Sequence, residues 1–238
     1  MKTLIFPDLH EPPAAVLETI ESTITGECPD RIVFLGDFFD QFHDGPEDAA
    51  RIARWLKASL ADPRRTHLIG NHDASYFWAY NATYCPGFTW EKRQEICKVM
   101  GKDLSRSKFV FHTWVDGWLL THAGLSANWY PEGTSLDRIV KWLDAEARAA
   151  RKSFADGKTH WFIAVGPKRG GMAPAGGILW CDHRELRPIP GLRQIYGHTP
   201  SHEVRWSRDH LCLDTNMGHG PQHYAVVEEG AVHVHPLS

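Results

Sequence analysis

Five short apolar segments of this chain each end in a group of polar side chains, and this repeated pattern constrains the fold more than any other feature of the sequence. The apolar segments lie at residues 4–6, 32–35, 68–69, 119–121 and 195–196 and have the composition of buried strands. In an open α/β sheet, ligands gather at the carboxyl ends of the strands. We therefore expect the five loops that follow these strands to converge on one point.

The segments between the strands predict helices. Apolar residues recur at helical spacing in residues 12–26, 46–61, 90–100 and 135–154. Residues 211–213 predict a further buried strand. Near the end of the chain, two apolar runs flank Glu228-Glu229-Gly230 and predict a hairpin. The order is mostly strand, helix, strand, which predicts an α/β architecture.

Length and composition favour one domain. The chain has 238 residues, of which 42% are hydrophobic, so residues 1–238 can enclose one substantial core. Residues 74–113 carry aromatic side chains and a predicted helix but no group of ligand type. We expect this segment to be a cap-like insertion that borders a substrate cleft.

Charge and cysteine content limit the partners and the compartment. The formal net charge of -3 gives no general attraction to nucleic acid, so a nucleic-acid partner is not expected. The apolar run before Pro7 is shorter than a signal-peptide core or a membrane span. Five cysteines without a CxxC pair fit reduced thiols. We expect a cytoplasmic protein that does not bind membranes; the sequence does not determine its oligomeric state.

The polar groups after the strands have the chemistry of a metal site. Taken singly, each is explained as well by a turn or a helix cap, but five such groups together are hard to obtain from caps and turns. Two divalent cations about 3.5–4 Å apart need a bridging carboxylate and terminal ligands on each side. We assign the bridge to Asp37. The six predicted ligands are Asp8, His10, Asp37, Asn71, His122 and His198.

This donor set favours certain metals and one kind of reaction. Oxygen and imidazole donors without a nearby cysteine favour manganese, with iron and zinc as alternatives. A metal pair activates a shared water for attack on phosphorus. The leaving group then needs a proton, and His72 is our candidate donor because it stands beside Asn71. Its neighbour Asp73 supplies a carboxylate that could keep the imidazole charged.

The motifs together resemble those of the calcineurin-like metallophosphoesterases. They are Asp8-x-His10, Gly36-Asp37-x-x-Asp40, Gly70-Asn71-His72-Asp73, Thr121-His122-Ala123-Gly124 and Gly197-His198-Thr199, which span residues 1–216 with the loops between them.

The resemblance implies two facing, mixed β-sheets with helices outside. It assigns Asp8, His10 and Asp37 to the first metal, and Asp37, Asn71, His122 and His198 to the second. It also implies that Asp40, rather than Asp73, orients His72 as the proton donor.

Other motifs resemble one branch of that family, which holds phosphoprotein phosphatases and symmetrical dinucleoside tetraphosphatases. These motifs are residues 122–124, 179–182 and 196–200. That branch normally follows the second aspartate of the Gly-Asp motif with Arg-Gly, and the arginine clamps the substrate phosphate. Here Gln41-Phe42 stands in its place, and a neutral amide does not replace a guanidinium fork. We name Lys168, Arg169 and Arg184 as candidate phosphate-binding residues.

The sequence therefore predicts a two-metal phosphoesterase that acts on a small phosphorylated substrate, either a phosphomonoester or a nucleotide-type phosphoanhydride. Three alternatives stay open. A phosphodiesterase or nuclease would use the same metal pair and would want a basic groove. A protein phosphatase would lack its arginine at Gln41. A non-catalytic scaffold would be expected to have lost ligand residues, and here all six are present.

Overall fold

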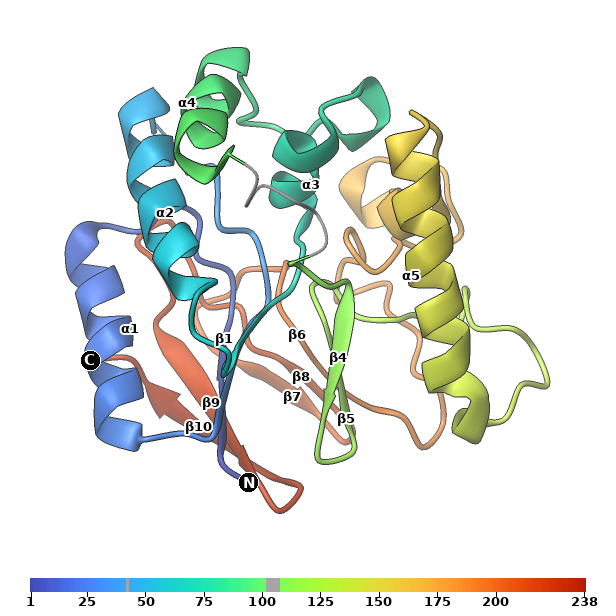
Figure 1. The fold of residues 1–238 in the computed structure, drawn as a ribbon. Coiled ribbons are helices and arrows are strands. Elements are labelled where there is room, and N and C mark those ends of the chain that lie inside the picture. Colours follow the sequence, from blue (N-terminus) through green and yellow to red (C-terminus); the bar gives the residue numbers. More distant parts are fainter. Residues whose placement is uncertain (42, 102–107) are drawn as a thin grey trace.

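The computed structural model describes residues 1–41, 43–101 and 108–238. Two five-stranded sheets face each other, and helices cover their outer sides (Figure 1). Both sheets contain parallel and antiparallel pairs. The fold class predicted from the sequence, two facing mixed sheets flanked by helices, is confirmed.

The first sheet is built from both ends of the chain. In spatial order its strands are β10 (Ala231–Pro236), β9 (His223–Glu228), β1 (Thr3–Phe6), β2 (Arg31–Phe34) and β3 (Arg65–His67). Strands β1, β2 and β3 run parallel, whereas β9 and β10 form the predicted hairpin. Helices α1 (Ala14–Glu27) and α2 (Pro46–Ser59) connect the three parallel strands.

The second sheet comes from the later half of the chain. In spatial order its strands are β4 (His112–Val115), β5 (Trp118–Thr121), β6 (Arg193–Tyr196), β8 (His210–Cys212) and β7 (Arg205–Ser207). The three central strands are parallel. Between β5 and β6 lie helix α5 (Ile139–Ala155) and short 3-10 turns at Leu136–Arg138, Trp161–Ile163 and Pro167–Arg169.

Side-chain alternation along the strands divides the core into two layers. Ile5 of β1 packs with Leu120 of β5 and Ile195 of β6 in the layer between the sheets. Its neighbours Leu4 and Phe6 belong to the layer under the helices. This alternation follows from the two-residue period of a strand, which sends successive side chains to opposite faces.

Some elements were not predicted from the sequence. The four predicted helices are present, with α5 beginning at Ile139 after a 3-10 turn. Helix α3 (Asn71–Trp78) and strands β4 and β7 were missed. Helix α3 is short, and turn-forming residues precede it, so its apolar periodicity is weak. It begins at a predicted ligand.

The predicted insertion, residues 74–113, comprises most of α3, a 3-10 turn (Asn81–Thr83), helix α4 (Trp90–Met100) and the start of β4. Residues 102–107 of this segment lie outside the described residues. Helix α4 packs against α2, and α3 and α4 lie at one end of the molecule (Figure 1). That this segment acts as a cap, and that residues 1–238 form one domain, stay predictions.

None of the helices in the described part of the chain combines the length and the apolar content needed to cross a membrane.

Candidate metal centre

The loops after five strands place polar side chains close together. The strands are β1, β2, β3, β5 and β6, as the sequence predicts, and the loop after β3 leads directly into α3. Four of these side chains are almost wholly enclosed, namely those of Asp8, Asp37, Asn71 and His122. His198 is nearly so, and His10 is half-buried.

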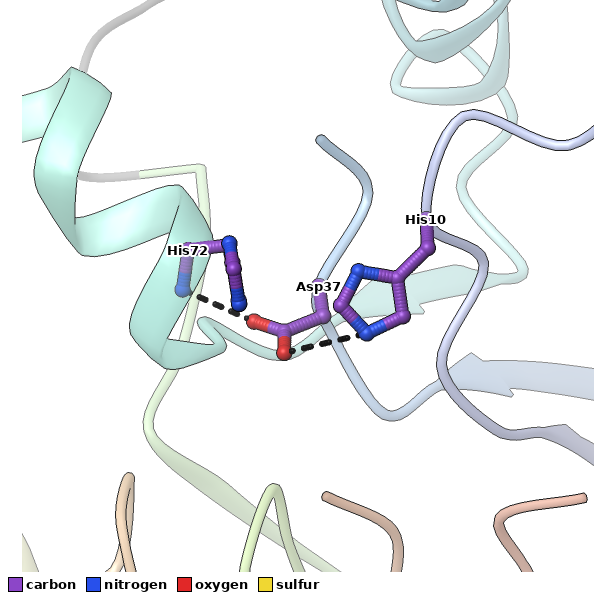
Figure 2. A group of neighbouring side chains, drawn as sticks. All are labelled: His10, Asp37 and His72. Atoms are coloured by element: carbon purple, nitrogen blue, oxygen red, sulfur yellow. Dashed lines mark hydrogen bonds and ion pairs between the residues drawn. The ribbon is translucent and has the colours of Figure 1, made fainter. Parts of the chain in front are cut away.

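Two groups of side chains within the described residues could each hold a metal ion. One consists of His10, Asp37 and His72, and the other of Asp37, His122 and His198. In each group the candidate ligand atoms all lie within 4.8 Å of one another. Figure 2 shows the Asp37 carboxylate between the His10 ring and the backbone nitrogen of His72. Asp37 belongs to both groups, which is the position a bridging carboxylate needs.

Backbone carbonyls orient two of the histidines. His10 Nδ1 lies 2.8 Å from the Asp40 carbonyl oxygen, and His122 Nδ1 lies 3.0 Å from the Leu35 carbonyl oxygen. Because a carbonyl only accepts, Nδ1 of each ring carries the hydrogen. Each Nε2 then faces Asp37 Oδ2, at 3.6 Å from His10 and 3.4 Å from His122. Metal-binding histidines are commonly fixed in this way.

The second group surrounds a space lined by acceptors. His122 Nε2 lies 2.9 Å from Asn71 Oδ1 and 3.1 Å from His198 Nδ1. If the Asn71 amide were turned over, its nitrogen would lie 3.2 Å from Asp37 Oδ2 and 2.9 Å from both imidazoles. So many buried acceptors facing one another need an N–H donor or a cation among them. Their oxygen and imidazole chemistry fits manganese, iron or zinc.

Asp8 lies beside His10 and the His198 backbone. Its oxygen Oδ2 lies 3.9 Å from His10 Nε2, and both of its oxygens accept hydrogen bonds from the His198 backbone nitrogen, at 3.1 and 3.0 Å. The Asn216 side chain donates to the carbonyl oxygens of Asp8 and Leu9. The loop that carries Asp8 and His10 is thus fixed from the C-terminal half of the chain.

The charges around Asp37 show how strongly the site attracts positive charge. Burial would raise the pKa of Asp37, but the charges of His122, His72 and His10 hold it well below its usual range. Burial would lower the pKa of His122, but Asp37 and Asp8 raise it to about 9. Burial and repulsion from His122 hold the pKa of His198 well below its usual range. These shifts favour an ionised Asp37 carboxylate and a neutral His198 imidazole.

His72 meets Asp40 rather than Asp73. Its Nδ1 lies 2.9 Å from Asp40 Oδ2. Burial would lower the pKa of His72, but the Asp37 charge and the hydrogen bond to Asp40 raise it well above its usual value. The residues alone left both carboxylates open, the resemblance of the motifs favoured Asp40, and the structure brings Asp40 to this ring.

Asp73 instead holds the Asp37 loop against the start of α3. Its Oδ2 accepts from the backbone nitrogens of Asp37 and Gly70, and its Oδ1 accepts from that of Phe38, each at 2.8 Å. A carboxylate three residues into a helix normally bonds back to the cap in this manner. With three backbone donors on its two oxygens, Asp73 orients Asp37 and does not reach His72.

Several residues at the site have left-handed backbones. The φ angles of His10, Asp37 and His198 are 49°, 50° and 68°, and that of Asp40 is 67°. Residues other than glycine adopt this backbone conformation at a cost of about 1–3 kcal/mol each, and such strain concentrates at functional sites. The loops are held in these conformations by bonds between them, such as that from His10 N to the Asp37 carbonyl oxygen, 2.8 Å.

Comparison with known proteins identifies the family. A family model described as calcineurin-like phosphoesterase matches residues 1–234. The chain belongs to the calcineurin-like phosphoesterase family. It is accordingly a metal-dependent phosphoric ester hydrolase, as the resemblance of its motifs predicts.

Solved structures share the fold of this phosphoesterase at low sequence identity. A proposed diadenosine tetraphosphatase matches with a TM-score of 0.53 and 16% identity, over 99% of this chain and 93% of that one. A serine/threonine phosphatase from Saccharomyces cerevisiae, with similarity to human phosphatase PP5, matches with a TM-score of 0.53 and 12% identity, over 99% of this chain and 79% of that one. A search of curated proteins finds no match.

The three predicted phosphate-binding cations lie in different environments in this phosphoesterase. Arg169 donates through its Nη2 to the His198 carbonyl oxygen at 3.0 Å, and its Nε lies 3.2 Å from Asp182 Oδ2. Arg184 forms a two-bond fork with Asp182, at 2.8 and 2.9 Å, and its side chain is 57% exposed. Lys168 is exposed. Arg169 is the one of the three that contacts a candidate ligand residue.

Sequence reasoning missed three side chains that contact the site. Cys85 Sγ accepts from Asn71 Nδ2 at 3.0 Å, and Tyr76 and Lys92 both contact Asp40 Oδ1. Tyr76 follows His72 by four residues, a spacing that places both on one face of a helix, so a correct prediction of α3 would have found it. Cys85 and Lys92 carry no such local signal.

The close packing of Gly197 against Asp8 generates a prediction. A Cβ added at Gly197 would lie 1.9 Å from Asp8 Oδ1, so Gly197→Ala must displace this carboxylate. We expect the affinity of the phosphoesterase for Mn²⁺ to fall by roughly 10–100-fold, the range for loss of a positioning contact. Calorimetric titration of the metal-free protein with Mn²⁺ measures this affinity.

Gly26→Ala is the matched control, because no atom of the described residues lies within 4 Å of a Cβ added there. We expect this helix variant to bind Mn²⁺ as the unaltered protein does. Unchanged affinity in Gly197→Ala would show that Asp8 is not a ligand.

Proposed function

We propose that this phosphoesterase hydrolyses a phosphomonoester or a small nucleotide-type phosphoanhydride with two divalent ions. The observation that carries the proposal is the shared position of Asp37 in two groups of potential ligands. A metal pair bridged by such a carboxylate supplies a hydroxide from bound water at neutral pH and neutralises charge on the phosphoryl oxygens.

The ligands divide into two sets around Asp37. We assign Asp8, His10 and Asp37 to the first ion. For the second, we assign Asp37 with the acceptors beyond it: Asn71, His122 and His198. Manganese is our first choice, and iron and zinc have the same donor preference. His122 Nε2 and His198 Nδ1, 3.1 Å apart, support the second set because a cation between them would relieve their contact.

His72 lies in the first group by distance, but we assign it to proton transfer. Its Nδ1 is engaged by Asp40 at 2.9 Å, and the Asp37 charge favours the protonated ring. A protonated imidazole has a proton to give to a leaving alkoxide. Asp40 would fix the direction in which the ring presents that proton.

Arg169 is our candidate for the phosphate clamp that Gln41 cannot supply. Its guanidinium bonds to the His198 backbone and to Asp182, so it is held beside the ligands while its side chain stays 29% exposed. A fork of N–H donors in this position suits phosphoryl oxygens. We consider Lys168 and Arg184 less well placed because neither has a described contact with a ligand residue.

A small substrate fits these observations better than the alternatives. The two fold neighbours act, by their descriptions, on diadenosine tetraphosphate and on protein serine or threonine phosphate, and their TM-scores are equal. Gln41 argues against the protein phosphatase, and the net charge of -3 argues against a nuclease. The complete ligand set argues against a scaffold. A cytoplasmic location stays our prediction from the cysteine pattern.

Metal dependence is the first prediction. Excess chelator should abolish hydrolysis of p-nitrophenyl phosphate, since the chain's own residues provide no activated nucleophile in this proposal, and added Mn²⁺ should restore it. Steady-state assays with Mn²⁺, Fe²⁺ and Zn²⁺ rank the metals. Full activity in excess chelator would contradict the two-metal proposal.

His72→Asn tests the proton donor. We expect kcat on phenyl phosphate, whose leaving group needs a proton, to fall by about 10²–10⁴-fold, the usual contribution of general acid catalysis, while metal content stays at two ions per chain. Metal analysis after gel filtration separates the two roles open to His72. Loss of one ion would make His72 a ligand instead. The exposed His202→Asn provides a control that should leave both quantities unchanged.

Arg169→Ala tests the phosphate clamp. Loss of a charged hydrogen bond to substrate should raise KM by roughly 10–100-fold, with metal content unchanged. Arg184→Ala, which removes the other guanidinium on Asp182, should leave KM near its original value. The reverse order of effects would transfer the role to Arg184, and no effect in either variant would remove both candidates.

A further inference from the structure

Helix α4 places a buried lysine directly behind the candidate proton-delivery pair. The Lys92 side chain is 4% exposed. Its Nζ lies 3.1 Å from Asp40 Oδ1 and 2.5 Å from Asp44 Oδ2, and it donates to the Gly87 carbonyl oxygen at 3.0 Å. Three acceptors match the three N–H groups of an ammonium ion.

These contacts exclude some roles for Lys92. With its three N–H groups engaged inside the protein, the lysine has none left to bind a substrate phosphate, so it does not substitute for the arginine missing at Gln41. It is also an unusual choice for stability alone, because a buried ammonium loses its hydration and a buried ion pair seldom recovers more than that cost. A role through its partner Asp40 explains its presence better.

The two oxygens of Asp40 have separate partners. Lys92 Nζ and the Tyr76 hydroxyl both bond to Oδ1, the latter at 2.5 Å. The other oxygen, Oδ2, meets His72 Nδ1 at 2.9 Å. A carboxylate with one occupied oxygen can still rotate about its Cβ–Cγ bond. Two donors on Oδ1 fix that rotation and leave Oδ2 aimed at the imidazole.

The backbone around Lys92 is arranged for this contact. Thr89 caps α4, its Oγ1 accepting from the Lys92 nitrogen at 3.2 Å, which sets the first turn of the helix. Gly87 has a φ of 98°, and a Cβ there would lie 2.8 Å from Asp40 Cγ. The loop before α4 therefore packs closely onto Asp40.

We propose that Lys92 is a positioning residue: by fixing Asp40, it holds the His72 imidazole in the direction needed to protonate the leaving group. This inference rests on the proposed function. Helix α4 would then support catalysis through the ion pair between Lys92 and Asp40. This pair joins α4 to the Gly36-Asp37-x-x-Asp40 loop, 52 residues away in sequence.

A comparison of leaving groups tests the proposal. General acid catalysis matters little for p-nitrophenyl phosphate, whose leaving group is a weak base, and much for phenyl phosphate. For Lys92→Met with Mn²⁺, we expect kcat on phenyl phosphate to fall by roughly 10–100-fold, as for other positioning contacts. On p-nitrophenyl phosphate it should fall by less than about threefold, because little general-acid assistance is lost there. Lys98→Met, which removes an exposed lysine of the same helix, should change neither.

A second measurement reports the orientation of the His72 ring and does not depend on enzyme activity. In NMR spectra of the zinc-loaded protein, the Nδ1 proton of His72 should be protected from solvent exchange by its bond to Asp40. Lys92→Met should expose it, and Lys98→Met should not. If the unaltered enzyme hydrolyses neither ester, the proposed function fails while this spectrum still tests the position of His72.

Two results would overturn the inference: equal loss on both esters, which marks a general structural effect, or an unchanged Nδ1 resonance together with unchanged kinetics. Should Lys92→Met not fold, Lys92→Gln carries the same comparison, because its amide still fills the space but removes the charge.

Discussion

The carboxylate of Asp37 lies where the loops of the two sheets meet, and most of the site is arranged around it. Its Oδ2 faces the His10 and His122 rings, and Asp73 holds its backbone at the start of α3. A buried anion of this kind is costly unless positive charge surrounds it. The burial of Asp37 therefore favours positive charge at this point, where the loops that carry the candidate ligands meet.

Close backbone packing makes this arrangement possible. A Cβ at Gly70 would lie 2.0 Å from Asp37 Oδ1, just as one at Gly197 would collide with Asp8. Glycine at both positions lets the carboxylates sit against the neighbouring loop instead of projecting into solvent. The left-handed φ angles of His10, Asp37 and His198 add local strain, so these loops depend on one another for their shape.

Much of the fold, and the convergence of the candidate ligands, could be predicted because their signals are local. An apolar run followed by Asp8 or His122 can be recognised from a few consecutive residues, and parallel strands bring their carboxyl ends to one edge of the sheet. The roles of Asp73, Lys92 and Arg169 depend on which loops pack together. Asp73 stands next to His72 in sequence, yet the first turn of α3 directs it to backbone nitrogens, and Asp40 takes its place.

The sequence by itself determined the α/β order of the elements and the kinds and order of the candidate ligands, because strand periodicity and strand-end chemistry are properties of short segments. The two-sheet architecture was implied by the resemblance of the motifs. The tertiary structure alone decided that Lys92 of α4 stands behind Asp40 and that Arg169 rather than Arg184 contacts the His198 backbone. It also placed Asp40, which the resemblance of the motifs had favoured, beside His72. Those contacts join residues 29 to 52 positions apart. Their geometry follows from the packing of whole helices and loops, which no local pattern encodes.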